Sequence, residues 1–310
     1  MEVVGIKRNK SQSILGYVLI FLAGSFWGTG GYYITQMGKL GASSFMTGFT
    51  GHLFALLPLM LIILVTRGVK GLKISKRGLI FAVIMGIVTK GFFKLAYDSS
   101  VVIAGVSTAA VLLYTSPVFV AILSRIFFKE KLKAHNYLAL VLNLTGVFLM
   151  VTLGDVKRLN VELLGVVLAL TAALLHASNT ILGKFATSGD HPLTTTFYML
   201  VASTITQGIA AKPWTAHNLD LFANSTFLFW AIINALVTGA LANTFYLTGL
   251  STDIDASKAP VLSSSEVIVA ALIGVLAFSE PMNWIGILGM IMMLVSIVLM
   301  NANRQTLKEE

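Results

Sequence analysis

Residues 104–132 read AGVSTAAVLLYTSPVFVAILSRIFFKEKL, and residues 254–282 repeat the stretch in altered form as IDASKAPVLSSSEVIVAALIGVLAFSEPM. A constant shift of 150 residues aligns the two stretches, and the helices that follow them end in the matching phrases VFLM and IVLM. The aligned positions include Ser107 with Ser257, Ala109 with Ala259, Pro117 with Val267, and Glu130 with Glu280. The repetition predicts two related halves, residues 1–153 and 154–310.

The composition around these stretches is that of a membrane protein. Hydrophobic residues make up 56% of the chain and charged residues only 11%, whereas charged residues usually reach about a quarter in soluble domains. A net charge of +9 would suggest nucleic acid in a soluble protein, but the basic residues gather in short segments between apolar runs, which excludes that class. The chain has no cysteine, so disulfides and thiolate metal sites are excluded as well.

Ten apolar runs are long enough to be membrane-spanning helices, which need about 20 residues each. The first follows three basic residues but is too long for the apolar core of a signal peptide, so we expect it to be retained as a span. The predicted spans are approximately 14–36, 43–65, 79–97, 101–124, 136–153, 162–184, 192–211, 226–247, 256–278 and 282–301.

The loop charges predict the topology. With a cytoplasmic N-terminus, the ten-span arrangement assigns sixteen Lys and Arg residues to cytoplasmic segments and four to external ones, as the positive-inside rule requires. The chain is therefore predicted to be an all-α, multi-pass protein of the cytoplasmic membrane with both termini in the cytoplasm. Because five spans per half is an odd number, the halves must insert in opposite orientations, as an inverted repeat.

Two ionisable residues are expected at similar depth near the membrane centre, Lys90 in the third span and Glu266 in the ninth. They can pair with each other or both face a polar cavity. Lys94 lies one turn beyond Lys90, where it can line the same cavity or reach the external surface. The other half carries Ala240, Thr244 and Ser116 at the positions equivalent to Lys90, Lys94 and Glu266. An asymmetric ligand explains this difference better than the scaffold does.

Several polar and aromatic residues within the spans are further candidates for substrate contact. Ser263 adjoins Glu266 on the ninth span, and Trp27 and Tyr114 are placed to stack on a ligand. His176, like His52, can bond a substrate or only link two helices, and Asn243 needs a hydrogen-bond partner in hydrocarbon. The chain shows no catalytic constellation, no metal motif and no phosphate-binding loop, so we expect neither an enzyme nor a cofactor.

The chain resembles the EamA-type proteins of the drug/metabolite transporter superfamily. The resemblance rests on the ten spans, on FWG at 26–28, and on TSPVFVAILSRIFFKEKL at 115–132 with its counterpart at 263–282. It implies two inverted five-helix halves that rock about a central cavity between helices 3, 4, 8 and 9. The residues it would bring near substrate are Lys90, Lys94, Tyr114, Asn243 and Glu266. Val267 replaces the proline of the first half, which argues against equal kinks in the two halves.

These observations predict a secondary transporter for a small polar metabolite, an amino acid or related zwitterion above all, that acts as a monomer or weak dimer in the lipid bilayer. Lys90 or Lys94 would neutralise a carboxylate and Glu266 would hold an amine, and protonation of Glu266 is a candidate for proton coupling. Export is the common direction in the proteins that the chain resembles. The alternatives are a carrier of organic anions, a carrier of organic cations or drugs, and a membrane scaffold or sensor.

Overall fold

The computed structural model describes residues 10–160 and 162–301, and these ranges contain helices but no β-strand. The helices of the first half are α1 (Lys10–Gly28), α2 (Gly30–Gly38), α3 (Ser44–Arg67), η1 (Val69–Leu72), α4 (Lys76–Ile84), η2 (Met85–Phe92), α5 (Phe93–Leu113), α6 (Ser116–Phe128) and α7 (Ala134–Thr152). Those of the second half are η3 (Val156–Arg158), α8 (Leu163–Ala186), α9 (Pro192–Ala211), α10 (Ala216–Ala223), α11 (Ser225–Asn234), η4 (Ala235–Leu241), α12 (Ala242–Ser251), η5 (Ala256–Lys258), α13 (Ala259–Ser263), α14 (Ser265–Phe278) and α15 (Trp284–Asn301).

Seven helices within the described ranges are long and apolar enough to cross a membrane. They are Ser13–Gly38, Ser44–Arg67, Lys76–Leu113, Ala134–Thr152, Leu163–Ala186, Ser225–Ser251 and Ala256–Phe278. Two further apolar helices, Ser116–Phe128 and Trp284–Met300, are shorter. The chain is therefore an all-helical, multi-pass protein, and the count of ten spans remains a prediction.

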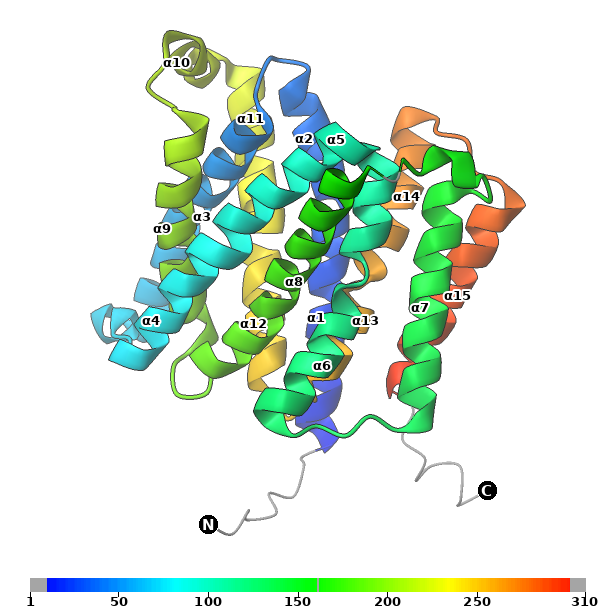
Figure 1. Cartoon of the computed structure of the whole chain (residues 1–310). Helices are drawn as coiled ribbons and strands as arrows, with labels where there is room; N and C mark the ends of the chain where they lie inside the picture. The colour runs from blue at the N-terminus through cyan, green and yellow to red at the C-terminus, as the bar shows by residue number, and fades with distance from the viewer. Residues whose placement is uncertain (1–9, 161, 302–310) are drawn as a thin grey trace.

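The two halves run through the bundle in opposite directions (Figure 1). Helix α1 begins and α15 ends at the same end of the bundle, which we call the lower end. Helix α6 also ends at the lower end, whereas its counterpart α14 ends at the opposite, upper end. The corresponding helices of the two halves therefore point in opposite directions.

The expected boundary between the third and fourth spans is wrong. We expected the break at residues 98–100, but the helix continues through Asp98 and is interrupted at Gly105. Lys94 forms an ion pair with Asp98 at 3.3 Å, so this carboxylate does not end the helix. Gly105 has φ 81° and ψ 160°, a backbone conformation that glycine adopts at little cost.

Both halves deviate from regular helix at equivalent places. The π-helical turn η2 of the first half corresponds to the π-helical turn η4 of the second. The break between α5 and α6, at Tyr114 and Thr115, likewise corresponds to the break at Ser264 between α13 and α14. The expectation of unequal kinks is thus wrong, because the break precedes Pro117, which occupies the first turn of α6, where proline is tolerated.

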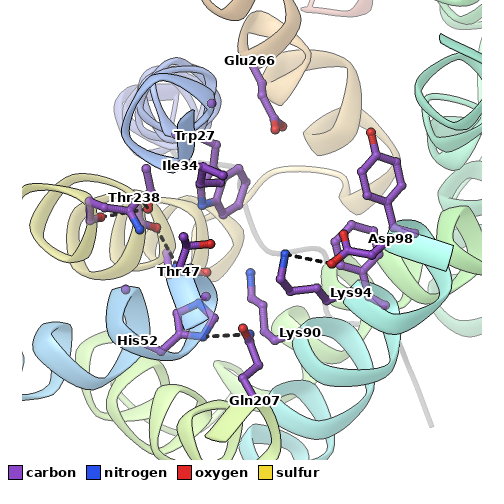
Figure 2. A pocket seen from close by; sticks show the side chains of 18 residues that line it. Trp27, Ile34, Thr47, His52, Lys90, Lys94, Asp98, Gln207, Thr238 and Glu266 are labelled. Carbon is purple, nitrogen blue, oxygen red and sulfur yellow. Dashed lines mark hydrogen bonds and ion pairs between the residues drawn. The ribbon is translucent and has the colours of Figure 1, made fainter. Parts of the chain in front are cut away.

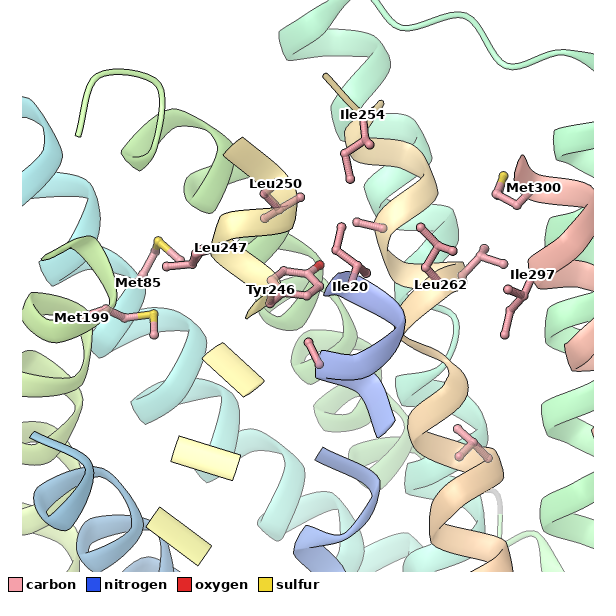
Figure 3. Packing of buried hydrophobic residues seen from close by; sticks show 14 of the residues in the cluster. Ile20, Met85, Met199, Tyr246, Leu247, Leu250, Ile254, Leu262, Ile297 and Met300 are labelled. Carbon is pink, nitrogen blue, oxygen red and sulfur yellow. The ribbon is translucent and has the colours of Figure 1, made fainter. Parts of the chain in front are cut away.

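Part of a buried hydrophobic cluster lies toward the lower end of the bundle, where α12 ends. Side chains of α1, η2, α12 and α13 meet there, as Figure 3 shows. Its members include Ile20, Met85, Leu247, Leu250 and Leu262, each at most 2% exposed. Small residues let α1 pack closely beside this cluster, since a Cβ added at Gly28 would lie only 2.5 Å from the Glu266 carbonyl oxygen.

Candidate functional site

A cavity of about 300 Å³ lies above the hydrophobic cluster, between helices of both halves. We call it the central cavity (Figure 2). Its lining residues are Trp27, Gly30, Gly31, Ile34, Thr47, Gly48, Gly51, His52, Lys90, Phe93, Lys94, Tyr97, Asp98, Gln207, Asn234, Thr238, Asn243 and Glu266. Five of the eight predicted substrate-contact residues line this cavity: Trp27, Lys90, Lys94, Asn243 and Glu266.

Lys90 and Glu266 approach the central cavity from opposite sides (Figure 2). Within the described residues, neither side chain makes a hydrogen bond, and they form no ion pair with each other. The Lys90 ammonium instead lies 5.2 Å from the centre of the Trp27 ring, a cation–π contact. Of the two arrangements left open above, the structure therefore shows the one in which both groups face a cavity.

Lys94 differs from Lys90 although it lies one turn away on the same helix. Its ammonium pairs with the Asp98 carboxylate at 3.3 Å and donates a hydrogen bond to the Ser44 hydroxyl at 2.5 Å. The side chains of Lys94 and Asp98 are 17% and 26% exposed. Lys94 thus lines the cavity as one member of an internally neutral pair, whereas Lys90 does so as a cation without a carboxylate partner among the described residues.

The π-helical turn η2 places Lys90. Thr89 closes this turn by donating to the Met85 carbonyl at 2.8 Å, and its hydroxyl lies 3.0 Å from the Asn179 side-chain oxygen. A π turn inserts an extra residue into a helix and rotates the following side chains relative to the preceding ones, and such turns often occur at functional sites. Gly86 packs η2 directly against the backbone of Met199 in α9. The cation therefore projects from a closely packed element.

The equivalent turn η4 forms part of the opposite wall. The Asn243 amide donates to the carbonyl oxygens of Gly239 at 2.8 Å and Thr238 at 3.0 Å, both of which lie in the π turn. The Thr238 hydroxyl donates to Asn234 one turn earlier. Asn243 thus finds the hydrogen-bond partners that its burial requires within its own helix, while one side of it still lines the cavity.

A polar group on α3 and α9 completes the lining. His52 Nδ1 lies 2.8 Å from the Ser203 hydroxyl and 3.1 Å from the Gln207 amide nitrogen, which also donates to Ser203 at 3.2 Å. If Nδ1 accepts the amide hydrogen of Gln207, the ring proton must lie on Nε2. The Gln207 side-chain oxygen is buried and has no partner in the described part of the chain. Among the described residues, the group therefore keeps one strong acceptor beside the cavity without a partner.

Three predicted contact residues lie outside the cavity lining. Tyr114 sits at the break after α5 and packs against the hydrophobic cluster. His176 packs against the ring of Phe93, with ring centres 5.4 Å apart, so that Phe93 and not the histidine meets the cavity. Ser263 is 7% exposed and donates to the Pro260 carbonyl at 3.2 Å. The structure does not bring these three side chains into the cavity lining, and their contact with substrate stays a prediction.

Other lining residues had not been singled out in the sequence. Among them are Thr47 on α3, Gln207 on α9, and Thr238 in the π turn η4. Gln207 offered a signal, since an uncharged amide in an apolar span needs a partner or a polar cavity. The threonines offered none, because a hydroxyl can bond the carbonyl of its own preceding turn anywhere in a helix.

Comparison with known proteins identifies the family. The EamA-like transporter family matches the chain twice, at residues 14–152 and 163–302. The chain belongs to this family. It is 27% identical over 217 residues to an "Uncharacterized transporter" from Archaeoglobus fulgidus, covering 70% of this chain and 75% of that one. It is 24% identical over 251 residues to "Uncharacterized transporter YyaM" from Bacillus subtilis, covering 77% and 78%.

The fold has a solved counterpart. A crystal structure of another protein, 13% identical in sequence, superposes with a TM-score of 0.79 over 97% of this chain and 99% of that chain. At this identity the likeness concerns the fold alone. The family, which is part of the drug/metabolite transporter superfamily, and the apolar helices make this EamA-like protein a membrane transporter.

Proposed function

We propose that this EamA-like protein is a secondary transporter for a small zwitterion, above all an amino acid. The observation that carries the proposal is that Lys90 and Glu266 face one cavity from opposite sides, with no ion pair between them. An unpaired charge is costly at this depth, and a ligand of opposite charge offsets the cost. Lys90 would bind the carboxylate and Glu266 the ammonium group.

The charges around the cavity support a zwitterion over an ion of either sign. The lining carries two lysines and two acidic residues, and Lys94 and Asp98 already neutralise each other. One cation and one anion remain, Lys90 and Glu266. An organic anion would leave Glu266 unpaired beside it, and an organic cation would leave Lys90 unpaired. The volume of about 300 Å³ is at the lower end of the usual range for ligand sites, which suits a molecule of amino-acid size.

The test compares three forms of the same compound. Thermal unfolding of the purified protein is followed with each of the twenty amino acids, and then with the N-acetyl derivative and the amide of the best one. The acetyl group removes the positive charge and the amide removes the negative charge, so each should protect the protein much less than the parent. Equal protection by the N-acetyl derivative would instead identify an anion carrier, and equal protection by the amide a cation carrier.

Transport itself is tested by counterflow in proteoliposomes with the protective compound. The substitutions Lys90→Gln and Glu266→Gln should each abolish exchange, whereas Lys157→Gln, in an exposed loop, should not. If no amino acid gives either protection or counterflow, the proposal is rejected. If a wider metabolite panel also gives neither, a scaffold or sensor is favoured.

We further propose that the chain spans the membrane ten times as an inverted repeat, with the lower end in the cytoplasm. Support comes from the opposite directions of α6 and α14 and from the basic loops 67–77 and 125–135, both at the lower end. The halves would rock about the central cavity in alternating access. Export, the proposed direction, rests on the family resemblance. Faster efflux of the substrate from preloaded cells that overproduce the protein would support it, and faster uptake alone would reject it.

Proton coupling through Glu266 is the remaining part of the proposal. A carboxylate that loses its charge on protonation no longer pairs with a substrate ammonium, so proton binding would promote substrate release. Proteoliposome transport should then respond to an imposed pH gradient, and Glu266→Gln should abolish the response. If transport by the unsubstituted protein does not respond to the pH gradient, the coupling is ruled out but the zwitterion site is not.

A further inference from the structure

Two glutamates occupy equivalent and similarly built positions at the ends of α6 and α14. Each follows a residue in the left-handed helical conformation, Lys129 with φ 56° and Ser279 with φ 55°. The backbone N–H of Glu130 then donates to Ser124 at 3.4 Å, and that of Glu280 donates to Gly274 at 3.1 Å. The same C-terminal turn therefore presents a carboxylate at the lower end in one half and at the upper end in the other.

Among the described residues, only the first of these carboxylates has hydrogen-bond partners. Glu130 accepts hydrogen bonds from the backbone N–H groups of Ala256 at 2.7 Å and Ser257 at 3.0 Å, and from the Ser257 hydroxyl at 2.7 Å. It thereby joins the end of α6 in the first half to the start of η5 in the second. Hydrogen bonds to a carboxylate are about twice as strong as neutral ones, so this contact links the halves firmly.

Other contacts close the bundle around this link. Lys184 donates to the Ile254 carbonyl, and Lys258 donates to the Tyr17 hydroxyl at 3.3 Å. Between the link and the central cavity lie the hydrophobic cluster and the rings of Trp27 and Tyr246, whose centres are 5.1 Å apart and whose planes are tilted by 49°. The structure is therefore closed between the cavity and the lower end.

The corresponding contact at the upper end is not formed. Glu280 is exposed, folds back over Gly274, and has no hydrogen bond or ion pair within the described residues. Its targets under the 150-residue shift are Val106 and Ser107, which start the helical segment after the Gly105 break. Val106 is 65% exposed, and the Ser107 hydroxyl has no partner in the described part of the chain. The chain therefore has the donors and the acceptor for the second contact, but no hydrogen bond joins them in this structure.

We propose that Glu130 and Glu280 are alternating latches of the transport cycle. The contact of Glu130 with Ala256 and Ser257 holds the lower end closed in the state seen here. In the opposite state that contact opens, and Glu280 accepts hydrogen bonds from the backbone of Val106 and Ser107 and from the Ser107 hydroxyl, which closes the upper end. The inference rests on the proposed alternating access, but it does not depend on the identity of the substrate.

The exchange follows from the inverted repeat. If each half keeps its own shape while the halves rock, a contact made by one half at the lower end must have a counterpart made by the other half at the upper end. The two states then differ by which latch is formed, so their free energies remain close although each latch alone is strong. Both states can then be populated, as a transporter requires.

Cysteine labelling can test the latches, because the chain has no cysteine of its own. The reporter is Leu250→Cys, which is 1% exposed here and should react with a maleimide only when the lower end opens. We expect Glu130→Ala to raise the labelling rate at least about tenfold, since it removes three hydrogen bonds to a charged group. Adding Glu280→Ala should reverse much of this increase, and Glu280→Ala alone should not raise the rate.

Glu162→Ala is the matched control, since Glu162 also stands at a helix end but makes no capping hydrogen bond. It should leave the rate unchanged. If Glu130→Ala unfolds the protein, the milder Glu130→Gln takes its place, and both are checked by their melting temperature. Unchanged labelling in a folded Glu130 variant, or an increase with Glu280→Ala, would overturn the proposal.

A second measurement detects the unseen contact directly. The pair Glu280→Cys and Ser107→Cys should form a disulfide slowly in the otherwise unchanged protein and at least about tenfold faster when Glu130→Ala is added. An equal rate in both backgrounds would contradict the exchange of latches. Neither measurement requires a substrate, so labelling that behaves as expected while no amino acid binds would reject only the zwitterion proposal.

Discussion

Replacing Lys90 by glutamine should weaken ligand binding without lowering the stability of the ligand-free protein. An unpaired charge near the membrane centre costs about 2.5–3.5 kcal/mol, and a cation–π contact such as that with Trp27 at 5.2 Å returns about 0.5–2 kcal/mol. The variant without ligand should therefore be as stable as the unsubstituted protein or up to about 3 kcal/mol more stable. Loss of a buried partner for the substrate carboxylate should cost about 2–5 kcal/mol of binding free energy.

Lys94→Gln is the matched control, since it removes the same charge from the same helix one turn away. It breaks the 3.3 Å ion pair with Asp98 and the 2.5 Å hydrogen bond to Ser44. Removing one member of a fully buried pair costs about 3–5 kcal/mol, but these side chains are partly exposed, so we expect a loss of about 1–2 kcal/mol. Lys94→Gln should thus lower the stability of the protein, whereas Lys90→Gln should not.

The assay is unfolding in detergent, followed by tryptophan fluorescence, with and without the protective amino acid. The binding loss expected for Lys90→Gln corresponds to a weakening of at least about 30-fold, so protection at a fixed ligand concentration should disappear. The reasoning would be refuted by a Lys90→Gln protein that is destabilised as much as Lys94→Gln and still binds the amino acid. Lys90 would then be a structural residue whose partner lies elsewhere.

Three further substitutions test the surroundings of the cavity. Gly28→Val should lower both the melting temperature and ligand protection, because its Cβ would lie 2.5 Å from the Glu266 carbonyl oxygen; unchanged values would contradict the close packing. Tyr246→Phe should lower stability by about 1–2 kcal/mol through loss of the 2.6 Å hydrogen bond with Thr180, as measured by unfolding. His176→Ala should change ligand affinity less than about threefold, since the side chain lies outside the cavity lining; a larger loss would place the histidine in the site.

The bulk properties and the repeat were readable from the amino-acid sequence. Apolar runs separated by basic loops predict a multi-pass membrane protein, because hydrocarbon excludes charge and unpaired backbone groups. The recurrence of the stretch at 104–132 predicted the two halves, and the family matches the chain at two successive ranges. Lys90 and Glu266 stood out because ionisable residues are rare at mid-membrane depth. All of these features depend on residue type and order along the chain.

The assignment of side chains to the central cavity depended instead on how the helices pack. Tyr114, His176 and Ser263 are polar or aromatic residues inside spans, as Trp27 and Asn243 are, yet only the latter two line the cavity. Hydropathy does not distinguish these cases, because a helix face can meet another helix, a lipid or a cavity. The π turns η2 and η4 also rotate the side chains that follow them, so regular helical spacing does not show which side chains face the cavity.

The amino-acid sequence by itself therefore determined the membrane environment, the repeat and the two unusual charges, since these follow from composition and spacing. Tertiary structure decided that, in the described part of the chain, Lys94 pairs with Asp98 whereas Lys90 has no carboxylate partner, and Glu130 is hydrogen-bonded whereas Glu280 is not. The reason is physical: the members of the repeat are chemically alike, and only their neighbours across the bundle differ. The free energy of a charged group depends on those neighbours, which are brought together by packing and not by position in the chain.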